Sequence, residues 1–142
     1  MKPAFDLRLW VARLLIGTVT AWNLQAAWVF FSAPERFAPA FELSSVPGNA
    51  AVRGMAVLFA MWNVPYLVAL WNPGRHRLSL WEAQAMQILG VLGESYIYFT
   101  LPASYVLLQT SILRFVVFDA AGAILLAMAL LISGKPISKP LA

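Results

Sequence analysis

Residues 112–133 have the sequence ILRFVVFDAAGAILLAMALLIS, which is long and apolar enough for a membrane-spanning helix. About 20 mainly apolar residues, folded as a helix, cross the roughly 30 Å hydrocarbon layer of a bilayer. Comparable stretches lie at about residues 9–31, 51–71 and 83–101, and prolines or glycines follow each of the spans. The sequence therefore predicts an all-α protein, an integral membrane antiparallel four-helix bundle in which residues 1–142 form a single transmembrane domain.

The composition agrees with a membrane protein and excludes several function classes. Apolar and aromatic residues make up 61% of the chain and charged residues only 11%, whereas an average soluble domain has about 25% charged residues. The net charge is +4, but the basic residues form no stripe of the kind that binds nucleic acid, so no nucleic-acid partner is predicted. The chain has no cysteine and one histidine, which excludes thiolate chemistry and the usual metal centres.

The distribution of Lys and Arg predicts the orientation in the membrane. Four crossings would place both termini and the connection between the second and third spans on one side. That side holds Lys2, Arg8, Arg13, Arg75, Arg77, Lys135 and Lys139, and the other side holds Arg36, Arg53 and Arg114. Basic residues favour the cytoplasmic side, so both termini are predicted to be cytoplasmic.

Two segments need separate interpretation. The apolar run from Leu14 to Phe31 is too long for a typical signal-peptide core, so the first span is predicted to remain in the protein. The outer loop, about residues 32–50, contains several prolines and aromatic residues. It is predicted either as a short amphipathic piece on the outer membrane face or as an irregular loop.

Polar residues inside the spans are the main candidates for a functional site. They are Glu94, Asp119, Arg53, Arg114, Asn23 and Asn63. Ionisable groups inside a bilayer are costly, and they usually face the bundle interior and find partners. A rise of about 1.5 Å per residue places Glu94, Asp119 and Asn23 at similar depths, roughly 10–12 Å from the outer ends of their spans. We therefore expect most of these side chains to converge.

Two interpretations of this convergence remain open. In the functional one, the residues form a small outward-facing polar cavity in which Glu94 and Asp119 carry a proton or bind a polar, quinone-like ligand head. In the structural one, the two acids pair with Arg53 and Arg114 and the asparagines link helices. Asn63 precedes Pro65 by two positions, and it either captures a backbone group freed at a kink or contacts a ligand. The small residues Gly90, Gly93 and 120–123 are expected to permit close helix packing.

Short motifs in the first part of the chain carry a resemblance to a known family. They are Arg13-Leu14-Leu15-Ile16-Gly17, Pro34-Glu35-Arg36-Phe37 and Ala50-Ala51-Val52-Arg53-Gly54. With the hydropathy pattern, they make the chain similar to the DoxX-like family of small four-helix bacterial membrane proteins. The resemblance implies a bacterial cytoplasmic (inner) membrane protein that acts as an accessory subunit of a membrane oxidoreductase or electron-transfer complex. The absence of cysteine excludes direct thiol chemistry.

The sequence thus leads to two predicted functions. The first is a non-catalytic or accessory integral membrane subunit, and the alternative is a small membrane binding or transport module that uses Glu94 and Asp119. An autonomous enzyme is least favoured, because the sequence offers no nucleophile and base pair, phosphate loop or metal constellation. No cofactor is predicted, although a quinone is possible. The expected partners are the lipid bilayer and either other subunits of a membrane complex or a second copy of the chain.

Overall fold

The protein is built from four long helices joined by short connections. A computed structural model describes residues 6–134, and within that range it contains no strand. The elements are α1 (Leu7–Ser32), η1 (Pro34–Arg36), η2 (Ala38–Phe41), α2 (Ser45–Trp71), α3 (Arg77–Thr100) and α4 (Val106–Ile132), where η denotes a short 3-10 helix. The predicted all-α class with four long helices is confirmed.

All four helices begin earlier than the sequence predicts, α1 by two residues and the other three by six. α2 begins at Ser45 rather than near residue 51, and it passes through Pro47 and Gly48, which were expected to be breaks. Pro47 lies in the first turn, where backbone N–H groups have no partner within the helix, so a proline costs little there. α3 begins at Arg77 and α4 at Val106. Hydropathy locates the apolar part of a helix and misses its more polar first turns.

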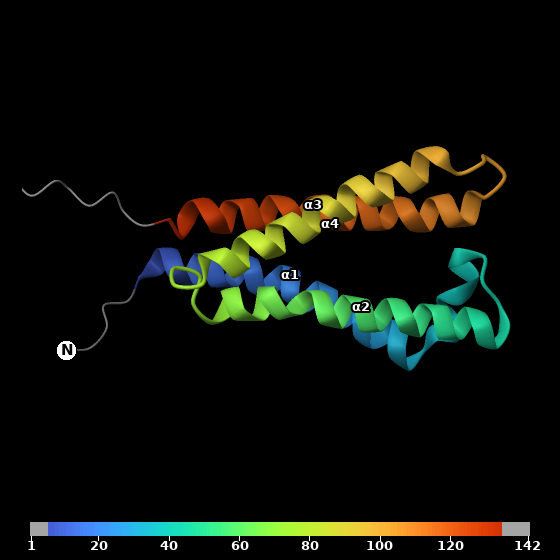
Figure 1. Ribbon diagram of the computed structural model, residues 1–142, viewed down its shortest axis with the longest axis horizontal. Helices are drawn as coiled ribbons and strands as arrows, with labels where there is room; N and C mark the ends of the chain where they lie inside the picture. Colours follow the sequence, from blue (N-terminus) through green and yellow to red (C-terminus); the bar gives the residue numbers. More distant parts are fainter. Residues whose placement is uncertain (1–5, 135–142) are drawn as a thin grey trace, which may run out of the picture.

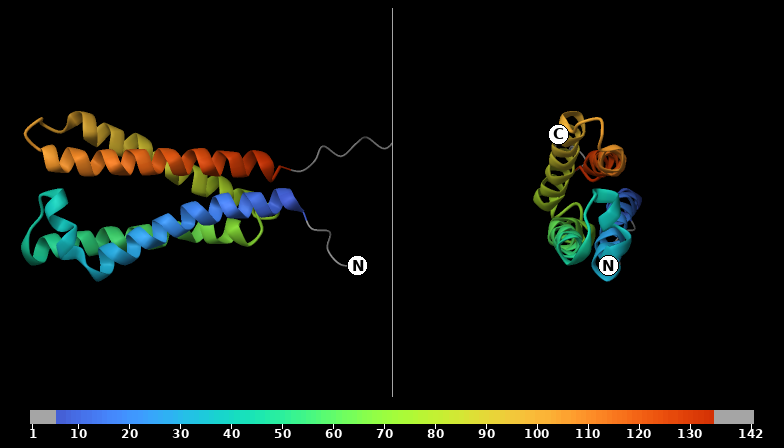
Figure 2. Two further views of the ribbon diagram at one scale, coloured as in Figure 1. Left: turned by 180° about the vertical axis from the view of Figure 1, so that it is seen from behind. Right: turned by 90° about the vertical axis from the view of Figure 1, so that its right-hand side faces the viewer.

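The four helices are arranged as two pairs. α1 packs on α2 and α3 packs on α4, and the pairs meet where α1 contacts α4 and α2 contacts α3. α1 and α3 run away from the end where α1 begins, and α2 and α4 return to it (Figure 1). The pairs lie close together at this end and diverge toward the other end, as the reverse view in Figure 2 also shows.

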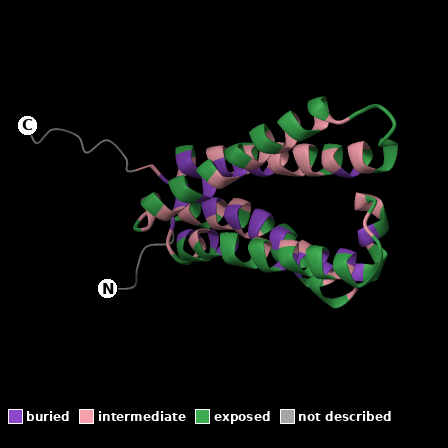
Figure 3. Cartoon of the chain, turned by 45° about the vertical axis from the view of Figure 1, so that its right-hand side comes forward, coloured by how far each residue is buried: buried purple, intermediate pink, exposed green. Residues whose placement is uncertain are grey.

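Two groups of buried side chains hold this arrangement together. All four helices contribute to the first group, which includes Ile16, Tyr66, Leu80 and Leu126 and fills the end where the pairs meet. Figure 3, which is coloured by burial, shows exposed residues along the outer surfaces of both pairs. The first group therefore joins the two pairs at the end where they lie close together.

The second group is an aromatic cluster beneath the outer loop. The Phe30 ring has its centroid 4.7 Å from that of Phe37 and 6.2 Å from that of Phe115. Phe59 of α2 also belongs to the cluster, with its ring 5.9 Å from that of Phe115. The outer loop is thus neither irregular throughout nor an amphipathic surface helix, because its two 3-10 helices turn aromatic side chains into the protein.

Three of the helices have the length and composition of membrane spans. Among the described residues these are α1, α2 and α4. α3 has 24 residues, which at about 1.5 Å per residue is long enough to cross a bilayer. Its sequence is less apolar, because it includes Glu82, Gln84, Gln87 and Glu94. The composition of α3 alone therefore does not identify the predicted span at 83–101 as a membrane span. Whether α3 crosses the membrane depends on where its polar side chains lie.

Candidate functional site

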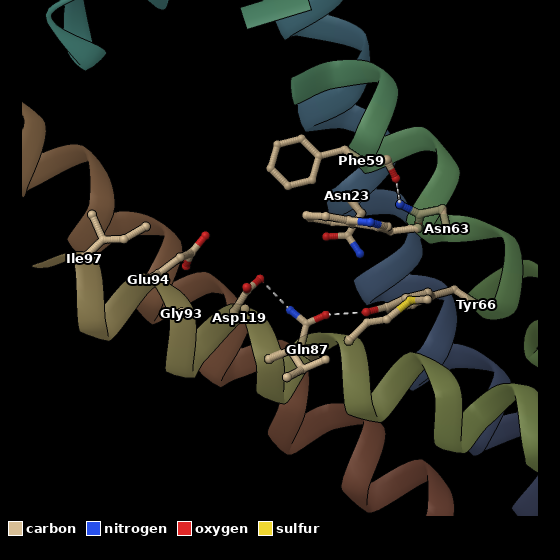
Figure 4. Close-up of a pocket in the computed structure, with 13 residues that line it drawn as sticks. Asn23, Phe59, Asn63, Tyr66, Gln87, Gly93, Glu94, Ile97 and Asp119 are labelled. Atoms are coloured by element: carbon tan, nitrogen blue, oxygen red, sulfur yellow. Dashed lines mark hydrogen bonds between the residues drawn. The ribbon is translucent and has the colours of Figure 1, made fainter. Parts of the chain in front are cut away.

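A pocket of about 520 Å³ lies between α2 and α3. Its polar lining comes from all four helices: Asn23 of α1, Asn63 and Tyr66 of α2, Gln87 and Glu94 of α3, and Asp119 of α4. Figure 4 shows these side chains directed toward a common space. Phe59, Trp62 and Met86 add apolar surface. The pocket therefore joins a polar interior to apolar walls.

A chain of hydrogen bonds crosses the pocket from α2 to α4. The Tyr66 hydroxyl donates to Gln87 Oε1 over 2.6 Å and lies 3.1 Å from the carbonyl oxygen of Ala83. Gln87 Nε2 donates to Asp119 Oδ1 over 2.8 Å. Tyr66 and Gln87 are buried, so these bonds fix the orientation of the Gln87 amide and of the Asp119 carboxyl group.

Two glycines make room for this chain. A methyl group added at Gly90 of α3 would lie 2.9 Å from Asp119 Cγ, and one added at Gly122 of α4 would lie 2.7 Å from Gln87 Cδ. Each helix thus accommodates a polar side chain of its neighbour above a glycine, which is the close approach expected of small residues in such bundles. At Gly93, no described atom outside the local backbone lies within 4 Å of the added methyl group, so this glycine leaves the pocket open.

Two buried oxygen atoms in the pocket are left without partners. Asn63 is 0% exposed, and its Nδ2 donates to the carbonyl oxygen of Phe59 over 2.7 Å. Asn63 Oδ1 and Glu94 Oε2 have no hydrogen-bond partner within residues 6–134. Buried polar atoms are usually satisfied, and the exceptions are often found at functional sites.

The hydrogen bond of Asn63 corrects one prediction. Pro65 lacks the N–H that would bind the carbonyl group four residues earlier, which belongs to Met61. Asn63 binds Phe59 instead. Its amide therefore does not capture the group that Pro65 frees, and Asn63 is available to the pocket through its oxygen atom.

The two arginines lie outside the pocket. Arg53 is exposed, and its Nε lies 3.4 Å from the carbonyl oxygen of Phe31. Arg114 is also exposed and borders a groove between α1 and α4, beside Trp22 and Gln25. In the described part of the chain, neither arginine forms an ion pair with Glu94 or Asp119. The predicted pairing is wrong, because arginines near helix ends can extend their long side chains toward water.

The structure thus brings together four of the predicted residues, Asn23, Asn63, Glu94 and Asp119. Tyr66 and Gln87 are site residues that the sequence analysis missed. Their spacing carried a signal, because Gln87 lies three residues before Gly90 and seven before Glu94, and Tyr66 lies three residues after Asn63. Residues three, four and seven apart share one face of a helix.

The lining has polar groups of three kinds. It offers two carboxyl groups, three amides and a phenol. Within residues 6–134, no group of three or more His, Asp or Glu residues is placed to hold a metal ion.

Comparisons of the chain with protein-family models, curated proteins and solved structures find no match. The resemblance to the DoxX-like family therefore stays a prediction.

Proposed function

We propose that this protein is an integral membrane protein that binds a small lipid-soluble molecule with a polar head in the pocket between α2 and α3. The observation that carries the proposal is the combination of a polar interior with an exposed apolar edge. Trp62, Leu89 and Ile97 border the pocket and are 47%, 68% and 44% exposed. A ligand dissolved in the bilayer can pass between these side chains and place its head group against the polar residues.

The proposal includes α3 as the fourth crossing of an antiparallel bundle. The polar residues Gln87 and Glu94 of α3 line the pocket, and polar groups in membrane helices are tolerated when they face the interior. Leu89, Leu92 and Phe99 of α3 are exposed and would face lipid. The excess of basic residues on the side of the termini supports cytoplasmic termini. The bacterial inner membrane is proposed from the resemblance to the DoxX-like family.

The topology gives a direct prediction. The chain lacks cysteine, so single cysteines at Arg75 and Ala103, which lie on either side of α3, can be labelled separately. In spheroplasts, we expect a membrane-impermeant maleimide to label Ala103→Cys and to reach Arg75→Cys only after permeabilisation. Labelling of both from one side would contradict a crossing by α3, and the reverse pattern would contradict the predicted orientation.

A pocket-filling substitution tests binding. An added Cβ at Gly93 has no described atom outside the local backbone within 4 Å, and Gly93 lines the pocket. We therefore expect Gly93→Leu to fold and to block the pocket. The probes are a phenylalkanol and a phenylalkylamine of equal chain length, each carrying a diazirine, added to the protein in lipid nanodiscs. We expect at least one probe to label pocket-lining peptides of α2 and α3 saturably, and Gly93→Leu to reduce that labelling about tenfold.

Gly54→Leu is the matched control. An added methyl group at Gly54 also has no described atom outside the local backbone within 4 Å, and Gly54 does not line the pocket. This variant should label like the parent protein. Labelling that is unsaturable, or that Gly93→Leu leaves unchanged, would refute the proposed function.

The role of accessory subunit in a membrane oxidoreductase or electron-transfer complex stays a prediction. A ligand pocket is compatible with such a role, because a subunit can hold a small molecule for its partner. Quinone as a cofactor and a second copy of the chain as a partner likewise remain predictions.

A further inference from the structure

We infer that the ligand of the pocket is an organic cation, a lipid-soluble amine with N–H donors, and that it exchanges for a proton at Glu94. This inference rests on the proposed function and specifies the chemical class of the ligand. Three independent features of the pocket support it: its charge, its unmet hydrogen-bonding capacity and its aromatic walls.

The charge of the lining is one-sided. Both of its charged residues, Glu94 and Asp119, are acids, and none of the described residues that line the pocket is basic. Removal of a charge from water is costly unless an opposite charge or a proton compensates it. Since Arg53 and Arg114 lie elsewhere, compensation within the pocket must come from a proton or from a cation that enters it.

The two buried polar atoms of the pocket that lack partners in the described part of the chain are both acceptors. Asn63 Oδ1 and Glu94 Oε2 are buried and have no partner within residues 6–134. Asn63 Nδ2 already donates to Phe59, and Gln87 Nε2 donates to Asp119. A ligand that brings N–H groups satisfies the free oxygen atoms, whereas the carbonyl groups of an oxidised quinone only add acceptors.

The aromatic side chains of the pocket also suit an organic cation. Phe59, Trp62 and Tyr66 line the pocket on the α2 side, and the rings of Phe59 and Trp62 meet edge to face with centroids 5.8 Å apart. Aromatic faces attract ammonium groups, most strongly when the cation is desolvated. The volume of about 520 Å³ also leaves room for an apolar body beyond the ammonium group.

The exchange of a proton follows from the groups around Glu94. Asp119 of α4 and Tyr66 of α2 are the titratable groups that share the pocket with Glu94, and α1 contributes the uncharged Asn23. An ammonium ion that binds to a protonated Glu94 forms a carboxylate and ammonium pair and releases one proton to water. Charge in the pocket is conserved, because one cation enters for each proton that leaves.

Binding of the same phenylalkylamine and phenylalkanol to the protein in nanodiscs tests the inference. We expect the amine to bind at least about tenfold more tightly than the alcohol. Between about pH 6 and pH 8 the amine stays charged, as lysine does, so release of one proton should tighten its binding by up to about tenfold per pH unit. Binding of the alcohol should not depend on pH, and a pH dye in weak buffer should report release of protons with the amine alone.

Two variants identify the residue. Glu94→Gln should remove both the preference for the amine and its pH dependence. Glu82→Gln is the matched control, because Glu82 lies on the same helix, is exposed and does not line the pocket. This variant should bind like the parent protein, and retention of the preference in Glu94→Gln would overturn the role of Glu94.

The outcomes separate this inference from the proposed function. Equal binding of amine and alcohol, with saturable labelling of the pocket, would reject the cation and leave the proposed function intact. A preference for the amine without proton release would reject the exchange. Absence of saturable labelling by either probe would reject both proposals. The comparison of the two probes on the parent protein tests whether the ligand is a cation, even if a variant fails to fold.

Discussion

Replacement of Gly122 by alanine is expected to destabilise the protein by about 1–3 kcal/mol, because the new methyl group needs space that Gln87 occupies. The methyl group would lie 2.7 Å from Gln87 Cδ and 3.2 Å from Gln87 Cγ. Gln87 cannot move away without weakening its hydrogen bonds to Tyr66 and Asp119. Gly90→Ala should act similarly through Asp119. Thermal unfolding in mild detergent measures both effects.

The same substitution at Gly54 provides the control. No described atom outside the local backbone lies within 4 Å of a methyl group there. Alanine is a better helix former than glycine by up to about 1 kcal/mol, so Gly54→Ala should leave the melting temperature unchanged or raise it. If all three variants behaved alike, the interlocking of α3 and α4 through Gly90 and Gly122 would be contradicted.

The second large effect is that substitutions of the two acids, Asp119 and Glu94, should change the stability of the protein in opposite directions. Asp119→Ala should destabilise the protein by about 1–3 kcal/mol, because it leaves the buried Gln87 Nε2 without its acceptor. Glu94→Ala should instead raise stability, since it removes a carboxyl group whose buried Oε2 has no partner within residues 6–134. Melting temperatures of the two variants under identical conditions provide the comparison.

This contrast also separates structural from functional roles. Asp119 is bonded to α3 through Gln87, whereas Glu94 brings its polar group into the pocket at a cost to folding. Residues that serve binding are often unfavourable for stability. A loss of stability in Glu94→Ala equal to that in Asp119→Ala would show that Glu94 is held by structural contacts, and both proposals for the pocket would lose their basis.

Much of the fold could be predicted from the sequence, because long apolar stretches allow few alternatives. The stretch at 112–133 forms most of α4, and the stretch at 9–31 forms most of α1. Helix starts were less predictable, since the first turns of α2 and α3 contain polar residues, proline or glycine. Such residues are common in the first turn of a helix, where the backbone N–H groups have no partner within the helix. They are also common in loops, so their presence does not show where a helix begins.

The site was predictable in part. Depth arguments predicted that Asn23, Glu94 and Asp119 lie together, and all three line the pocket. They failed for Arg53 and Arg114, whose positions along the helices do not determine the direction of a long, flexible side chain. The bond between Gln87 and Asp119 depends on Gly90 facing Asp119 and Gly122 facing Gln87, and single-helix periodicity does not reveal the register between two helices.

Phe59 gives the pocket and the outer loop a shared wall. Its ring lines the pocket and also borders a smaller cavity of about 240 Å³ under the loop, beside Phe30 and Phe115. Its carbonyl oxygen accepts the hydrogen bond of Asn63. Closely packed side chains transmit displacement to their neighbours. A ligand that displaces the Phe59 ring must therefore also disturb the Phe30 and Phe115 rings that support the loop. Binding of a ligand in the pocket is thereby mechanically linked, through the Phe59 side chain, to the packing of the outer loop.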